Sequence, residues 1–521
     1  MKYPIGIQNF EKIRKEGFEY IDKTAFVYKL ADEGNYYFLS RPRRFGKSLL
    51  LSTFEAYFRG ERDLFEGLAI SELEQHWDRF PIFHLDLNTE KYDTLEALES
   101  KLNLALSGWE AKYGSNPNER SLSTRFEGVI GRAFEQEGKR VVILVDEYDK
   151  PMLQAIGNEA LQEAYRSTLK AFYGALKSCD RCIRFAFLTG VTKFGKVSVF
   201  SDLNNLIDIS LDRRYVSICG ITESELQGQF DGSVEALGEA NGMSKEECYA
   251  QLKHDYDGYH FDVNTEGIYN PFSILNTLAS QQFRDYWFET GTPTFLVRQL
   301  QKTNYRLSDM TEERLSADTL NSIDIMEETP LPLLFQSGYL TITGYDPRFR
   351  LYRLGFPNRE VKEGFIKYLV PFYTPKTDNK SRFSIEQFVS EVEQGRAENF
   401  MQRMEAFFAG GDYALMGDKE LYFQNAMYVF FTLLGLYVEV ERHTTDGRMD
   451  MLVQTKDYIY IIELKIDQTA DIALQQIDDK GYAKPFATDP RQLFKIGLNF
   501  STERRCIDGW KVEKEVSRFG A

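Results

Sequence analysis

Two separated groups of residues in this 521-residue chain have the types and spacing for phosphate chemistry. The first is Gly46-Lys47-Ser48, which stands between the short apolar run 36–39 and a stretch of helical character. Where a helix starts, backbone N–H groups bind phosphate oxygens, a lysine neutralises phosphate charge, and a serine hydroxyl binds Mg²⁺. Arg41 replaces the glycine usual five positions before Gly46, so the tripeptide alone also fits a basic turn that caps a helix.

An acidic strand end strengthens this first signal. Residues 141–145 form a continuous, largely β-branched apolar run that ends in Asp146-Glu147. In a P-loop protein the first of two such carboxylates holds Mg²⁺, and the second orients and activates the attacking water. An acidic loop after a core strand is common by itself, but it rarely accompanies a G-K-S loop in one α/β domain. We therefore predict ATP and Mg²⁺ as ligands, with Ser48 and Asp146 on the metal and Glu147 as the catalytic residue.

A third apolar strand is expected at 185–190 and ends beside two hydroxyl side chains, Thr189 and Thr192. In AAA-type ATPases a polar residue at this place helps to position the attacking water, whereas hydroxyls that merely cap a strand end are an equal alternative. The predicted nucleotide-binding set is Arg43, Arg44, Gly46, Lys47, Ser48, Asp146 and Thr189.

The arginine that would stabilise the transition state has several candidates. Two lie in the phosphate loop itself and two follow the third strand, namely Arg43, Arg44, Arg213 and Arg214. Any of them would serve within the chain or from a neighbouring copy, so a homo-oligomer stays open.

The second group of residues lies near the C-terminus and consists of Asp450, Glu463 and Lys465. Asp450 begins one expected strand, and a polar turn at 454–457 leads to the next. Residues two apart share one face of a strand, so Glu463 and Lys465 lie together, and pairing across the hairpin lets Asp450 approach them. Two carboxylates hold Mg²⁺, with Mn²⁺ as an alternative, and the metal lowers the pKa of an attacking water. The lysine would stabilise developing negative charge or position that water.

The alternative for this group is a solvated hairpin with alternating charges. Neighbouring polar residues favour the metal site, because Glu420 opens a helical stretch before the hairpin and could add a carboxylate. A helix after the hairpin carries further polar groups able to reach the metal or a phosphate, which are Gln475, Gln476, Lys480 and Tyr482.

The elements that must position these groups predict a multidomain α/β protein. Apolar strands alternate with helical stretches over residues 1–220, as in a P-loop, AAA-like ATPase domain with a parallel sheet. Residues 221–380 are more polar and helical and form a lid or connecting region, for which a winged-helix-like module is one option. Residues 381–521 hold the strand–turn–strand–helix pattern of a restriction-endonuclease-like α/β domain.

Composition excludes several classes of protein. The apolar fraction of 43% and charged fraction of 27% are those of an ordinary globular chain. The most apolar run, 427–438, is too short to cross a bilayer and predicts a buried helix. Five cysteines without a signal peptide favour a cytoplasmic protein with no membrane contact. A net charge of −16 argues against coating nucleic acid by bulk attraction, although a local basic groove would still bind it.

Motifs along almost the whole chain resemble one family, the bacterial AAA-ATPase-like proteins with a C-terminal PD-(D/E)XK nuclease-superfamily domain. They include PIGIQNFEKIRKEGFEYIDKT, SRPRRFGKSLLLS, ILVDEYDKP, FQSGYLTI, GRMDMLVQTKDYIYIIELK and ALQQIDDKGY. The loop R-P-R-R-F-G-K-S is this family's own variant, so Arg41 does not count against membership. The resemblance implies nucleotide and Mg²⁺ binding by Lys47, Ser48 and Asp146, and a nuclease-like site at Asp450, Glu463 and Lys465.

Two functions are consistent with these residues. The first is an ATP-hydrolysing protein coupled to Mg²⁺-dependent cleavage of phosphodiesters, in DNA more than in RNA, which would serve in defence or in mobile-element processes. The second is an ATP-driven switch or scaffold whose nuclease-like domain binds nucleic acid or a protein partner without cutting it.

Overall fold

A computed structural model describes residues 1–193, 200, 203, 205–289, 294–321, 329–373, 385–409, 419–435, 438–442, 451–504 and 506–515. The chain forms two compact units. The first contains residues 1–303 and 310–362, and the second contains residues 304–309 and 363–521. The finer division at residues 220 and 380 stays a prediction.

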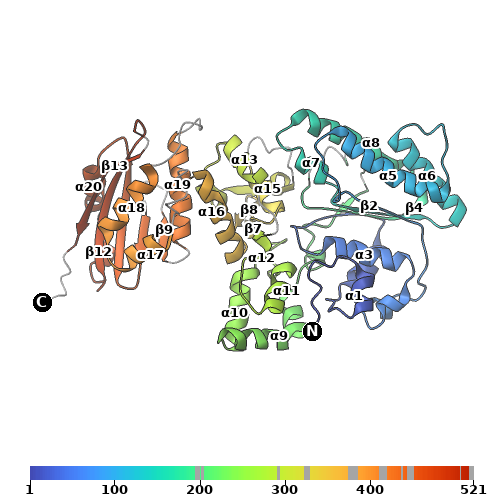
Figure 1. Cartoon of the computed structure of the whole chain (residues 1–521), viewed down its shortest axis with the longest axis horizontal. Helices are drawn as coiled ribbons and strands as arrows, with labels where there is room; N and C mark the ends of the chain where they lie inside the picture. Colours follow the sequence, from blue (N-terminus) through green and yellow to red (C-terminus); the bar gives the residue numbers. More distant parts are fainter. Residues whose placement is uncertain are drawn as a thin grey trace. The chain divides into compact units, whose positions relative to one another are not determined.

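A parallel five-stranded sheet is the centre of the first unit and confirms the predicted α/β class (Figure 1). The order β2-β3-β4-β1-β5 places β4 between β1 and β3. These central strands are buried along nearly their whole length, as their continuous apolar sequences predict. The strands are β1 (Tyr36–Ser40), β2 (Ile82–Asp86), β3 (Val141–Asp146), β4 (Ile183–Gly190) and β5 (Ile207–Asp208).

Helices cover both faces of this sheet. One face carries α1 (Phe10–Glu16) and α3 (Lys47–Phe58), and the other carries α5 (Leu95–Tyr113), α6 (Leu122–Glu137) and α8 (Glu159–Ser178) (Figure 1). The Phe54 ring of α3 packs against the rings of Phe185 and Phe187 at 5.0 and 4.9 Å between centroids, which fixes α3 on β4. Shorter elements are α2 (Thr24–Glu33), η1 (Arg62–Phe65), α4 (Ile70–Leu73), α7 (Lys150–Gln154), η2 (Asp180–Cys182) and η3 (Arg213–Tyr215).

A small helical bundle follows, made of α9 (Glu223–Asn241), α10 (Lys245–Tyr256) and α11 (Pro271–Ser280). A capping box begins α9, because the Thr222 hydroxyl accepts the N–H of Glu225 while the Glu225 carboxylate accepts the N–H of Thr222. The bundle has its own buried apolar core, which includes Leu226, Phe230, Val234, Leu237, Leu252, Tyr256 and Ile274.

The next elements alternate short helices with an antiparallel three-stranded sheet of order β6-β8-β7. From α13 onward the order of α-helices and strands along the chain is helix, strand, helix, helix, strand, strand. The winged-helix-like module suggested for this region stays a prediction. Their bounds are α12 (Tyr286–Glu289), α13 (Thr294–Lys302), η4 (Leu307–Thr311), β6 (Arg314–Ser316), α14 (Ala317–Asn321), α15 (Leu331–Gln336), β7 (Thr341–Asp346), β8 (Leu351–Gly355) and α16 (Arg359–Tyr373).

A buried carboxyl group joins three of these helices. Glu360, in the first turn of α16, is 1% exposed and accepts hydrogen bonds from the Ser273 hydroxyl of α11 at 2.7 Å and the Trp287 N–H of α12 at 2.6 Å. Burial raises the pKa of Glu360 to about 8, against the opposing effect of these two hydrogen bonds. The side chain is therefore mostly protonated at neutral pH.

Glu360→Gln should remove a pH dependence of stability. A carboxyl whose folded pKa is raised stabilises the fold below its unfolded pKa, and this contribution is lost as pH rises through about 8. The thermal midpoint of the variant relative to the parent should therefore rise by roughly 3 °C or more between pH 6 and pH 9. Circular dichroism melting curves would measure it. Glu266→Gln, at an exposed glutamate of the same unit, should show no such trend, and a flat difference for Glu360→Gln would contradict the assignment.

The second unit contains a mixed five-stranded sheet of order β13-β12-β11-β10-β9, as expected of the predicted C-terminal α/β domain. Strands β11 and β12 run parallel, while the other neighbouring strands are antiparallel. Helix α20 packs on β11 and β12 over a core that includes Leu452, Ile459, Ile461, Leu474 and Ile477. The elements are α17 (Ile385–Glu393), α18 (Ala397–Ala409), α19 (Lys419–Leu434), β9 (Glu439–Arg442), β10 (Met451–Gln454), β11 (Tyr458–Ile466), α20 (Ala470–Lys480), η6 (Lys484–Phe486), β12 (Gln492–Ser501) and β13 (Cys506–Lys514).

The apolar run that begins at residue 427 is helical up to Leu434, within α19, and most of its side chains there are buried. Among the described residues, none of the helices has the length and apolar character needed to cross a membrane.

Candidate functional site

The phosphate loop connects the end of β1 to the start of α3, as the sequence predicts. Gly46 immediately precedes the helix with φ of 95°, a left-handed conformation that strains any residue with a side chain. Lys47 is the first helical residue, and its side chain is 4% exposed. Its Nζ donates to the carbonyl oxygens of Arg41 at 3.1 Å and Pro42 at 3.2 Å, so the ammonium lies within the curve of the loop.

The two acidic residues at the end of β3 lie close to this loop. The Glu147 carboxylate is 3.5 Å from Lys47 Nζ, and Glu147 has φ of 53°, a rare conformation for a residue with a side chain. Asp146 is almost fully buried and accepts a hydrogen bond of 2.6 Å from the Thr189 hydroxyl of β4. This contact exists because β4 lies beside β3 in the sheet. Thr189 thus contacts the carboxylate predicted to bind Mg²⁺.

Thr192 has a different partner, an acidic residue that the sequence analysis did not single out. Asp149 is fully buried and accepts hydrogen bonds of 2.6 Å from both the N–H and the hydroxyl of Thr192, and one of 3.2 Å from the Val191 N–H. Burial and the nearby charge of Glu147 raise the pKa of Asp149 above its usual range. Asp149 therefore joins the loop after β3 to the loop after β4. Asp149 is visible in the sequence as the last residue of D-E-Y-D, but the sequence does not show that Thr192 is its partner.

Arg41, which occupies the usual glycine position, is a buried structural residue. The residue is 1% exposed, and its guanidinium donates to three carbonyl oxygens, of Ser40 at 2.9 Å, Ser210 at 2.7 Å and Tyr215 at 3.1 Å. It also stacks on the Phe261 ring, 3.8 Å from the centroid. Burial lowers the pKa of Arg41 to about 10, so it stays charged at neutral pH. The side chain holds the loop against the segment after β5.

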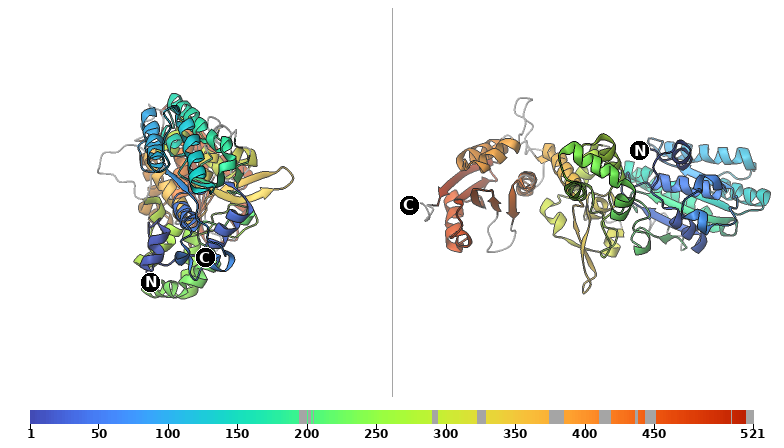
Figure 2. Two further views of the ribbon diagram at one scale, coloured as in Figure 1. Left: turned by 90° about the vertical axis from the view of Figure 1, so that its right-hand side faces the viewer. Right: turned by 90° about the horizontal axis from the view of Figure 1, so that it is seen from below.

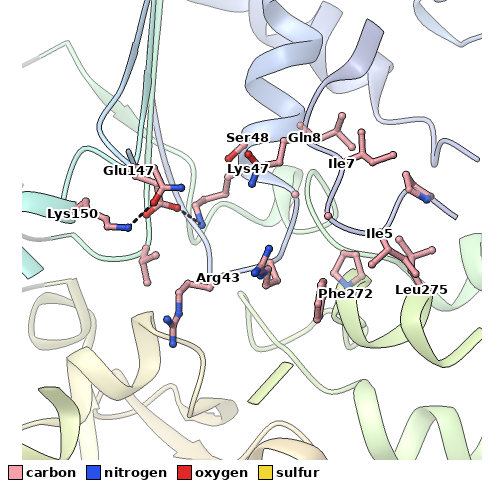
Figure 3. Close-up of a pocket in the computed structure, with 18 of the residues that line it drawn as sticks. Ile5, Ile7, Gln8, Arg43, Lys47, Ser48, Glu147, Lys150, Phe272 and Leu275 are labelled. Carbon is pink, nitrogen blue, oxygen red and sulfur yellow. Dashed lines mark hydrogen bonds and ion pairs between the residues drawn. The ribbon is translucent and has the colours of Figure 1, made fainter. Parts of the chain in front are cut away.

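A cavity of about 570 Å³ opens in front of the phosphate loop. Figure 3 shows Lys47, Ser48 and Glu147 at one end of it and Ile5, Phe272 and Leu275 at the other. The polar end comes from the loop and strand ends, and the apolar end comes from the N-terminal segment and α11. Such a volume is typical of small-molecule sites. The predicted residues Arg43, Arg44, Gly46, Lys47, Ser48 and Glu147 all line this cavity.

The candidate arginines separate into two pairs. Arg43 and Arg44 line the cavity, and the Arg44 guanidinium lies 4.9 Å from the centroid of the Phe272 ring. Arg213 and Arg214 are exposed residues in η3 that do not line it, and Arg214 forms an ion pair with Asp212 at 2.6 Å. The loop arginines are therefore the ones that face the cavity within this chain.

In the second unit, Glu463 and Lys465 lie together on β11 as predicted. Glu463 is 1% exposed, and its Oε1 accepts a hydrogen bond of 2.9 Å from Lys465 Nζ and another from the Gln476 amide of α20. The Lys465 ammonium also donates to Gln476 Oε1 at 2.7 Å. One carboxylate, one ammonium and one amide thus form a polar cluster between β11 and α20. It lies on the face of β11 where the sequence predicts metal chemistry.

Other residues of this prediction have different outcomes. Asp450 lies outside the described residues, and Met451, which pairs with Ile462, is the first one described in β10. Glu420 belongs to α19 as predicted. The prediction that Tyr482 reaches the metal site is wrong, because its ring packs into the apolar core with Leu474. Within the described ranges, no three acidic, His or Cys side chains gather as a metal-binding group.

Comparison with known proteins matches each end of the chain to a family. The model described as "Predicted AAA-ATPase" matches residues 4–200, and that of the PD-(D/E)XK nuclease superfamily matches residues 418–510. A protein of Azotobacter chroococcum mcd 1, named "Uncharacterized protein in vnfD 5'region", is 36% identical over 529 residues. The match covers 98% of this chain and 99% of that protein. The chain belongs to the AAA-ATPase-like family with a C-terminal PD-(D/E)XK nuclease-superfamily domain.

A solved structure of the ORC2 protein of Aeropyrum pernix, determined as ADPNP–ADP complexes, is a weaker match to this family member. It has 12% sequence identity and a TM-score of 0.26, and the match covers 67% of this chain and 91% of that one. A likeness this weak supports no argument about function.

Within this family member, Arg41→Gly should be destabilising although it creates the usual P-loop pattern. The substitution removes the donor to the Ser210 and Tyr215 carbonyls and leaves a cavity beside Phe261. We expect a loss of about 3 kcal/mol or more, measured by urea unfolding. Arg44→Gly is the matched control in the same loop, because Arg44 is exposed with φ of 67° and glycine suits that conformation. Equal stability of both variants would contradict a structural role for Arg41.

Proposed function

We propose that this protein is an ATP-hydrolysing enzyme whose C-terminal domain cleaves nucleic-acid phosphodiesters with the help of Mg²⁺ or Mn²⁺. The observation that carries the proposal is the pairing of Lys47 with Glu147 at the polar end of the 570 Å³ cavity. It puts a phosphate-binding cation and a candidate base beside each other at a helix start. The separate cluster of Glu463, Lys465 and Gln476 supports the second part of the proposal, the cleavage of phosphodiesters.

The residues of the cavity suit ATP. Its polar end offers the ammonium of Lys47, the start of α3 and the Ser48 hydroxyl for phosphates and Mg²⁺. Asp146, buried at the end of β3 and not among the lining residues, would be a further metal ligand. Its apolar end, at Ile5, Phe272 and Leu275, suits a nucleobase. Bound Mg²⁺ would neutralise developing phosphate charge. Glu147 would then hold and deprotonate the attacking water, while Thr189 keeps Asp146 in place.

The cluster of Glu463, Lys465 and Gln476 supplies one of the two carboxylates proposed to bind the metal ion. Glu463 is a buried carboxylate that would bind Mg²⁺ or Mn²⁺ together with Asp450. The metal would activate a water for attack on phosphorus. Lys465 would stabilise the charge that develops on the phosphate, and Gln476 would fix the orientation of both side chains.

Cleavage can be tested directly with the full-length protein. Plasmid, single-stranded DNA and RNA are incubated with Mg²⁺ or Mn²⁺, with and without ATP, beside an Asp450→Ala variant. We expect metal-dependent products that the variant does not form, with DNA cut more readily than RNA. Absence of cleavage under every condition would overturn the nuclease half of the proposal.

A second candidate is an ATP-driven switch that binds nucleic acid or a partner without cutting. The net charge of −16 favours it, because affinity for phosphate backbones needs positive charge gathered locally. Stimulation of ATP turnover by nucleic acid without any cleavage product would select this function over the first.

A further inference from the structure

The β7–β8 hairpin, residues 341–355, is the most basic exposed element of the first unit's small antiparallel sheet. Figure 2 shows it in yellow, reaching outward from the other elements of its unit. Its turn contains Arg348, Phe349 and Arg350, all exposed, and Phe349 is 59% exposed. The Arg348 guanidinium lies 5.0 Å from the centroid of the Phe349 ring, so the tip presents cationic groups and an aromatic ring together.

The hairpin and the neighbouring strand β6 carry more positive than negative side chains, whereas the whole chain has a net charge of −16. Four exposed arginines lie on the hairpin and its neighbour β6, which are Arg314, Arg348, Arg350 and Arg353. In the described part of the chain, the single carboxylate within ion-pair distance of them is Asp346, 3.4 Å from Arg314. Asp346 also accepts the backbone N–H groups of Arg348 and Phe349 at 3.0 and 3.3 Å, so it shapes the turn.

Strand pairing places two of these arginines side by side. Arg314 of β6 lies directly opposite Arg353 of β8, and like charges in such a pair repel each other. The next pair, Tyr345 with Tyr352, faces the other side of the sheet and brings the two rings to 4.8 Å between centroids. On β8, Arg353 and Tyr352 therefore face opposite sides of the sheet. Asp346 compensates the charge of Arg314, and a bound anion would compensate that of Arg353.

We propose that the β7–β8 hairpin binds duplex DNA, with its arginines on the phosphates and its tip in a groove. A two-stranded ribbon fits the major groove, and arginine binds phosphate through two parallel hydrogen bonds. The hairpin is convex, whereas single strands are bound in basic grooves lined by stacking rings, so the duplex is the better match. This inference rests on the proposed function only in taking nucleic acid as the ligand.

Fluorescence anisotropy with a labelled 30-base-pair duplex tests it, using the full-length protein in EDTA so that metal-dependent cleavage is absent. The test variant is Arg348→Glu with Arg350→Glu at the exposed tip. The control is Arg120→Glu with Arg181→Glu, which makes the same change in net charge at exposed arginines elsewhere in the unit. We expect the tip variant to bind about tenfold or more weakly, with a salt dependence reduced by about two counterions.

The control should bind within about twofold of the parent, since bulk charge alone has a small effect at a distance. Equal weakening in both variants, or no duplex binding by the parent, would overturn the inference. Loss of single-stranded but not duplex binding in the tip variant would also overturn it, in favour of a single-strand site. A parent that binds duplex through the tip but cleaves nothing would leave the inference standing and refute only the nuclease proposal.

Discussion

Glu147→Gln should reduce ATP turnover by about 100- to 1000-fold while ATP still binds with an affinity close to that of the parent. Glu147 lines the cavity, lies 3.5 Å from Lys47 Nζ and carries the charge needed to take a proton from water. Glutamine has the same shape but cannot accept that proton. Phosphate release measures the turnover, and titration with a fluorescent ATP analogue measures the binding.

Two further variants test whether the loss of turnover is specific to Glu147. Glu90→Gln, at an exposed residue of the same unit, should leave turnover unchanged. Lys47→Ala should weaken nucleotide binding itself, because it removes the ammonium at the polar end of the cavity. If Glu147→Gln hydrolyses ATP at the rate of the parent, Glu147 is not the catalytic base, and the G-K-S loop binds nucleotide with another residue acting on water.

Glu463→Gln should abolish metal-dependent DNA cleavage, with a loss of at least about 100-fold, because replacing even the outer-sphere partners of a metal costs 10- to 100-fold. The substitution keeps an acceptor for Lys465 and the side-chain volume at a site that is 1% exposed. What it removes is the negative charge that attracts the cation. Products are quantified from labelled DNA over a range of Mg²⁺ and Mn²⁺ concentrations.

The matched control for this second result is Glu513→Gln on β13, an exposed glutamate of the same sheet. It should cleave like the parent. ATP turnover of Glu463→Gln should also stay unchanged, because the residues that line the 570 Å³ cavity all belong to the other unit. Cleavage by Glu463→Gln at the parent's rate would show that Glu463 does not bind the catalytic metal.

The sequence was sufficient for the local parts of both sites. Neighbouring residues specify a strand, the glycine turn that follows it and the start of the next helix. The structure has the predicted loop between β1 and α3, where the sequence places it. The same holds for the acidic end of β3 and for the turn between β10 and β11. These features depend on backbone preferences and on strand periodicity, which nearby residues set by themselves.

Tertiary structure decided which distant segments complete these sites. The apolar end of the 570 Å³ cavity brings together Ile5 and Leu275, which lie far apart in the sequence. Gln476 reaches Glu463 from a helix beyond the hairpin. The sequence shows that Arg41 departs from the usual glycine, but only the fold shows its partners, the carbonyl oxygens of Ser210 and Tyr215. Such contacts depend on which faces pack together, and no local pattern encodes the partner of a buried polar group. The sequence by itself therefore determined the chemistry available to this protein, and the fold determined which side chains share each site.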